Sequence, residues 1–136
     1  HQLGLMDPEP TELANGLLWV GRLAQPMTPE DFAAHVSQRL ARPAQRVGRE
    51  TGSIERVAWC TGGGQGSIEQ AATLGVEAFL SGELSEQTTH QARELDLCYL
   101  AAGHLATERY GIQALGAHLA EHFGLWHRFV EIDNPA

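Results

Sequence analysis

The chain has 136 residues, of which 43% are hydrophobic, and this length and composition predict a single domain with a buried core. Its formal net charge of −8 argues against direct binding of nucleic acid, because contact with the phosphate backbone requires a basic face. No apolar run approaches the roughly 20 residues that cross a bilayer, and no signal-peptide pattern is present, so we expect no membrane association and a cytoplasmic location.

The first 28 residues predict little regular structure apart from one strand. The chain begins at His1 without an initiator methionine, and Pro8 and Pro10 are expected to break any element that contains them. The apolar residues 17–23 are typical of a first strand.

The segment that follows predicts an amphipathic helix over 29–40. Thr28 and Asp31 resemble a capping box, with a proline at the first helical position. Apolar side chains recur at helical spacing and predict its buried face: Phe32, Val36 and Leu40. Beyond this helix, a short strand is possible at 45–48, and residues 56–60 predict a central strand.

From there the chain repeats a short apolar strand, a turn of small residues and a helix. The three pairs are 57–60 with 67–74, 78–81 with 85–95, and 98–102 with 106–122. This alternation predicts the α/β class, with a mostly parallel or mixed sheet and helices on both faces. Cys60 and Cys98 each lie in an apolar run, which favours buried reduced thiols over a disulfide or a metal role.

The end of the chain predicts a covered helix and a closing strand. A buried helical stripe is expected from four apolar residues: Ile112, Leu115, Leu119 and Phe123. Gly124 is placed to end this helix. Residues 126–132 alternate in polarity and are expected to form a strand at an edge of the sheet.

His104 and Glu108 form a candidate site, because they stand four residues apart directly after the apolar run 98–102. One helical turn would bring both side chains to one face, at the carboxyl end of a strand, where open α/β sheets place their ligands. Imidazole and carboxylate can hold a divalent metal, although a catalytic zinc takes three protein ligands. A structural role is the alternative: the helix dipole favours Glu108, and Thr107 or His104 could cap the helix.

Two further turns are expected at the same edge of the sheet. The glycines Gly62, Gly63 and Gly64 form either a tight strand-to-helix turn or a contact for phosphate or substrate, and their spacing is not that of a nucleotide-binding motif. Glu83 has no evident structural role and is a candidate for supporting a ligand or facing substrate. His90 is a candidate for the same site, or else an exposed helical histidine.

Several motifs occur in order along the second half of the chain. They are VAWCTGGGQ at 57–65, FLSGELSEQT at 79–88, AGH at 102–104 continuing to ERYG at 108–111, and NPA at 134–136. Together they resemble the NIF-three-like (NGG-one interacting factor three) dinuclear metal-centre proteins, also catalogued as type-two GTP cyclohydrolase I. The likeness is strong from about residue 56 to the end and looser before it.

The resemblance implies two similar α/β lobes with two divalent metal ions between them, of zinc, iron or manganese, assembled into a hexamer. In that pattern the first lobe supplies a tandem histidine pair and an aspartate, and the second supplies a His-x-x-x-Glu that maps onto His104 and Glu108. Leu105 replaces a second histidine usual in this motif, and nothing in the sequence corresponds to the ligands of the first lobe.

The chain therefore looks like the carboxyl-terminal half of such a protein. Residues 1–55 would be the remainder of a linking region, with a strand, a capped helix and a loop. Residues 56–136 would be the metal-site lobe, and the two parts would form one compact unit without the amino-terminal lobe. Because the site is incomplete, the chain alone is expected to bind metal weakly.

The resemblance further implies a metal-dependent hydrolase of the GTP cyclohydrolase type, in which activated water attacks a purine ring carbon. Glu83 or His90 would then move protons, and the glycine turn would contact the phosphate of a nucleotide. The alternatives are a non-catalytic metal-binding or regulatory hexamer and a folded lobe without a metal function.

Overall fold

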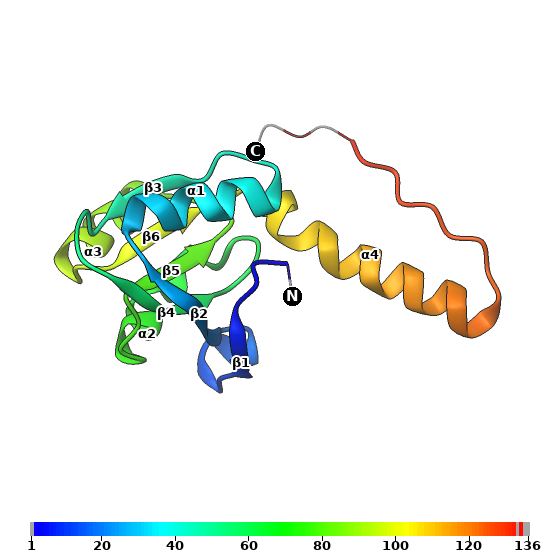
Figure 1. Ribbon diagram of the computed structural model, residues 1–136, viewed down its shortest axis with the longest axis horizontal. Coiled ribbons are helices and arrows are strands. Elements are labelled where there is room, and N and C mark those ends of the chain that lie inside the picture. The colour runs from blue at the N-terminus through cyan, green and yellow to red at the C-terminus, as the bar shows by residue number, and fades with distance from the viewer. Residues whose placement is uncertain (1, 133, 135–136) are drawn as a thin grey trace.

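A six-stranded mixed sheet organises the computed structural model, which describes residues 2–132 and 134 (Figure 1). The sheet order is β1-β2-β4-β5-β6-β3. The strands are β1 (Met6–Pro10), β2 (Trp19–Met27), β3 (Gln45–Gly48), β4 (Ile54–Trp59), β5 (Ala78–Ser81) and β6 (Cys98–Ala101). The helices are α1 (Pro29–Leu40), α2 (Ile68–Thr73), α3 (Glu86–Glu94) and α4 (His104–Phe123), with 3-10 turns at Leu13–Gly16 and Gly64–Ser67. Of the NPA motif, only Asn134 lies within the described residues.

The centre of the sheet is parallel and its flanks are antiparallel. β4, β5 and β6 are adjacent parallel strands, and each is followed by one of the helices α2, α3 and α4. β2 pairs antiparallel with β4, and β3 pairs antiparallel with β6. The sheet is therefore mixed, and residues from both 1–55 and 56–136 contribute strands to it.

Helices cover both faces of the sheet, as the sequence predicted. α1 packs on one face through its predicted stripe, Phe32, Val36 and Leu40. α2 and α3 pack on the other face through Ile68, Ala71 and Ala92. Phe79 and Leu80 belong to different clusters, because neighbours along a strand point to opposite faces. The predicted cap of α1 is also present: Thr28 Oγ1 accepts a hydrogen bond from Asp31 N at 3.1 Å.

The expectation for the first residues of the chain is wrong. Pro8 and Pro10 do not break the structure but lie in β1, one of the two edge strands of the described sheet, which pairs with β2. Proline is tolerated there because an edge strand has one side without ladder hydrogen bonds. The strand predicted at 17–23 is β2, which begins at Trp19 and continues to Met27.

α4 projects away from the sheet, and its predicted burial is wrong (Figure 1). Within this helix only Ala106 is buried. The four residues of the expected stripe are exposed: Ile112 57%, Leu115 51%, Leu119 39% and Phe123 63%. Helical spacing identifies an apolar face but not the surface that covers it. Gly124 ends the helix as predicted, and no helix in the described part of the chain has the length and apolar character needed to cross a membrane.

The expected closing strand is also wrong, since the described residues 126–132 pair with no strand and run back alongside α4 (Figure 1). Polar contacts fix this return: Arg109 forms an ion pair with Glu131, and Arg42 Nη1 donates to the carbonyl of Asn134 at 3.1 Å. The alternating polarity of the segment therefore does not report a sheet edge.

Both cysteines are free and buried, which confirms the expectation of reduced thiols. Burial raises the pKa of the Cys60 thiol, and it raises the pKa of Cys98 from 9.0 to about 11. Neither thiol is therefore poised as a nucleophile at neutral pH.

Candidate metal centre

Three loops meet where the parallel strands end, and together they carry the candidate site. The loops follow β4, β5 and β6, so their order in space follows the order of the strands. Their backbones are joined: Gly82 N donates to Gly62 O at 2.8 Å, and Gly103 N donates to Gly82 O at 2.9 Å. His104 follows directly as the first residue of α4, which places its side chain beside the other two loops.

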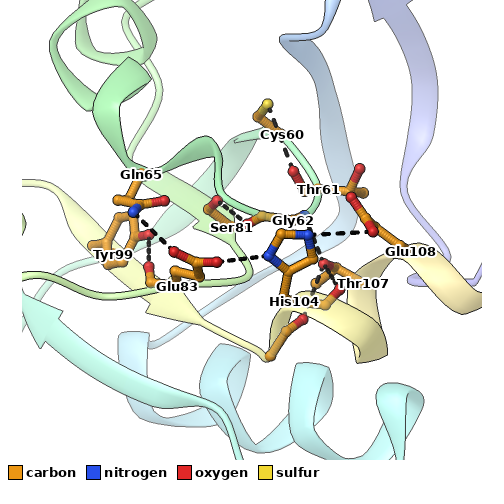
Figure 2. A network of polar contacts seen from close by, with 11 residues as sticks. Cys60, Thr61, Gly62, Gln65, Ser81, Glu83, Tyr99, His104, Thr107 and Glu108 are labelled. Atoms are coloured by element: carbon orange, nitrogen blue, oxygen red, sulfur yellow. Dashed lines mark hydrogen bonds and ion pairs between the residues drawn. The ribbon is translucent and has the colours of Figure 1, made fainter. Parts of the chain in front are cut away.

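His104 and Glu108 lie on one face of the first turn of α4, as their spacing predicted (Figure 2). His104 Nε2 is 3.4 Å from Glu108 Oε2, and both side chains are about half exposed, at 46% and 51%. Two donors that each lie about 2.0–2.1 Å from a tetrahedral zinc ion are separated by about 3.3–3.4 Å. The distance in the structure therefore fits two adjacent ligands of one metal ion.

Glu83 fixes the orientation of the imidazole from the opposite side (Figure 2). Its Oε1 is 2.6 Å from His104 Nδ1, so the carboxylate binds this ring nitrogen while Nε2 faces Glu108. A carboxylate that binds the second ring nitrogen is the usual outer partner of a metal-ligating histidine. The hydrogen bond raises the pKa of His104 and lowers the pKa of Glu83.

Two side chains outside the predicted set hold Glu83 in place. Gln65 Nε2 donates to Glu83 Oε2 at 3.1 Å, and the Tyr99 hydroxyl donates to the Glu83 carbonyl. Gln65 directly follows Gly64, so its place beside the glycine turn is a signal in the sequence for a contact at this site. Tyr99 lies inside β6, and nothing in the sequence indicates its contact with Glu83.

The glycine turn adjoins the side chains of His104 and Glu108, called the donor pair below. Gly62 has a φ of +65°, and a Cβ on it would overlap Glu108 Oε1 and lie 2.9 Å from His104 Nε2. Its amide donates to Thr107 Oγ1 at 2.9 Å, which ties the turn to the first turn of α4. Thr107 is thus a further positioning residue, although sequence reasoning considered it only as a possible cap.

The remaining predicted residues are less closely connected to the pair. A Cβ on Gly63 would lie 3.5 Å from Glu83 Oε1, whereas one on Gly64 would meet Cys60 and Ser81 instead. His90 is exposed on α3 and has no part in the hydrogen bonds described above. Its proposed role in proton transfer and that of the glycines in phosphate contact stay predictions.

The described residues hold no group of three or more histidine, cysteine, aspartate or glutamate side chains that could hold a metal ion. His104 and Glu108 thus provide two donors, and the third neighbour, Glu83, is engaged with the far side of the imidazole. The spacing of His104 and Glu108 is compatible with two ligands of one metal ion, and Glu83 lies on the other side of the imidazole.

Comparison with known proteins gives a consistent family. The family model described as Duf34/NIF3 (NGG1p interacting factor 3) matches residues 1–135. A protein of Allochromatium vinosum named GTP cyclohydrolase 1 type 2 homolog is 85% identical, and one of the same name from Pseudomonas aeruginosa is 50% identical. Each match covers 100% of this chain and 54% of the relative, so the chain spans about half the length of these relatives. A solved structure titled protein ybgI, of unknown function, shares 43% identity at a TM-score of 0.88 and matches 99% of this chain and 54% of its own.

Proposed function

The chain belongs to the Duf34/NIF3 family, and from this membership and the site geometry we propose that it contributes His104 and Glu108 to a dinuclear metal centre. The observation that carries the proposal is the orientation of the His104 imidazole between two carboxylates. Nδ1 is bound by Glu83 at 2.6 Å, and Nε2 faces Glu108 Oε2 at a separation that suits one metal ion.

We further propose that the complete centre is that of a hydrolase of the GTP cyclohydrolase type, after which the two curated relatives are named. Bound divalent ions, of zinc, iron or manganese, would supply Lewis acidity that lowers the pKa of water near the pair. Glu83 would hold a proton on His104 Nδ1, which leaves Nε2 as the nitrogen that faces a bound metal ion. Gly62 leaves the room that both donor side chains occupy.

The other ligands would come from residues beyond these 136. The chain spans about half of its curated relatives, and two donors leave most of a coordination shell unfilled. In this proposal the exposed apolar face of α4 lies against the rest of the protein, and the intact protein assembles into a hexamer.

Formate release from GTP tests the enzymatic proposal on the full-length protein loaded with zinc, iron or manganese in separate samples. We expect formate from the unchanged protein and from the control variant Glu94→Ala, an exposed carboxylate on α3. Glu108→Ala should release none. Absence of formate at every metal loading would overturn the hydrolase, and metal binding without formate would support the non-catalytic metal-binding hexamer instead.

A further inference from the structure

A small cavity, partly open to solvent, lies near His104 and Glu108 and has Thr61, in the turn at Gly62, in its wall. Its volume is about 150 Å³. It is lined by Gln2, Leu3, Leu5, Pro8, Leu40, Trp59, Thr61, Leu80, Thr107 and Tyr110. Two of these, Thr61 and Thr107, immediately precede Gly62 and Glu108, so the cavity adjoins the candidate metal centre.

The described walls of this cavity are mostly apolar. Among the described lining residues none is Asp, Glu, Lys or Arg, so a phosphate or carboxylate inside would lose hydration without gaining a charged partner there. Two aromatic residues, Trp59 and Tyr110, are among the walls, and contacts with their rings would favour an aromatic ligand over an aliphatic one. An apolar cavity of this volume is large enough for a benzene-sized ring.

The polar groups at the cavity differ in their availability. Thr107 Oγ1 accepts from Gly62 N and lies 3.0 Å from Gly103 O, so its hydrogen-bonding capacity is largely used. The hydroxyl of Thr61 has no hydrogen-bond partner within residues 2–132 and 134, and Figure 2 shows this side chain next to Glu108. A polar substituent on a bound ring could therefore form a hydrogen bond with Thr61, on the side of the cavity nearest His104 and Glu108.

The N-terminal wall is held in place by α1. Gln2 Nε2 donates to Arg39 O at 2.8 Å, and Arg39 Nε donates to Gln2 O at 2.5 Å. His35 Nε2 lies 2.8 Å from the carbonyl of Leu3. These contacts tie the chain start, which forms part of the wall, to the helix.

We propose that this cavity binds a neutral six-membered aromatic ring, whose polar substituent is directed toward Thr61 and the His104–Glu108 pair. The assignment of this cavity as the pocket for a ring of the substrate rests on the proposed function. Binding of the ring itself does not require a metal, so the two proposals can fail separately.

Phenol is the probe, and the indole N–H signals of the three tryptophans in an NMR titration of this chain without metal are the readout. We expect roughly millimolar binding, as is usual for a ligand of this size. The Trp59 signal should move, and that of Trp126, which is 84% exposed on the returning segment, should not. Cyclohexanol should bind at least threefold more weakly than phenol, and benzoate should not bind.

Two leucine variants locate the probe. Leu5→Phe adds volume to the wall of the cavity and should weaken phenol binding at least tenfold. Leu17→Phe makes the same change at an exposed position outside the lining and should leave phenol binding unchanged. The proposal is overturned if unchanged protein shows no saturable shift at Trp59, if cyclohexanol binds as well as phenol, or if both variants behave alike. Zinc titration of the same samples reports on the metal proposal independently.

Discussion

Replacing Gly62 by alanine is the sharpest test of the site, because a Cβ at this position would meet the side chains of both His104 and Glu108. Its φ of +65° is a left-handed conformation, and its Cα faces the atoms that we assign as metal donors. A single added methyl group therefore acts on the backbone and on the pair at the same time.

The two effects differ in kind and can be measured separately. An L-residue in the left-handed region costs roughly 1–2 kcal/mol, so we expect the free energy of unfolding of Gly62→Ala to fall by about that amount. The overlap falls on the ends of two flexible, half-exposed side chains, which can swing aside. The steric effect should thus appear in metal binding, with a loss of about 10- to 100-fold, as when an outer partner of a ligand is removed.

Gly66→Ala is the matched control in the same turn. Gly66 has no positive φ, and a Cβ there would meet nothing within 4 Å. This variant should be unchanged or up to about 1 kcal/mol more stable. Urea unfolding gives the stabilities, and the zinc-induced shift of the His104 ring signals gives relative affinities even when binding is weak. If both variants match the unchanged protein in stability and in zinc affinity, the assigned role of Gly62 is wrong.

Three further outcomes follow from the contacts described. Glu83→Gln should lower the pKa of the imidazole that it contacts, followed by NMR, and weaken zinc binding about 10- to 100-fold, whereas the exposed Glu94→Gln should change neither. The Cys98 pKa of about 11 exceeds its ordinary 9.0, so the unfolded chain loses this proton first. Stability should therefore fall as the pH rises from about 9 to 11, by at most about 2.7 kcal/mol, and Cys98→Ala should lack this part of the slope in urea unfolding. Phe32→Ala should cost about 3–5 kcal/mol because Phe32 is fully buried, and Phe123→Ala, at 63% exposed, should stay within about 0.5 kcal/mol; equal costs would contradict the arrangement of α4.

Local signals in the sequence predicted the elements whose physics is local. The capping box at Thr28 located the start of α1, and Gly124 located the end of α4, because each depends on neighbouring residues alone. The exposure of Ile112 and the strand through Pro8 were not predicted. Both depend on what lies beside an element in space, an uncovered helix face in one case and an outer edge of the sheet in the other.

The same distinction applies to the candidate site. His104 and Glu108 could be paired from their spacing, because one helical turn fixes their relation. The approach of Gly62 to that pair joins residues 42 or more positions apart and depends on the parallel order of β4, β5 and β6. Glu83 was suggested by its place after a strand, but its partner, the Nδ1 atom, emerges only from the folded arrangement.

Because α4 projects from the sheet and carries the donor pair in its first turn, a rotation of the helix about its first residues moves both its far end and the pair. Its 20 residues make a rod about 30 Å long. A tilt of about 10° at the root moves the far end by roughly 5 Å and atoms one turn from the pivot by about 1 Å. A productive metal site tolerates displacements of only about 0.5 Å. A surface that binds the far end of α4 would therefore determine the positions of His104 and Glu108 from a distance.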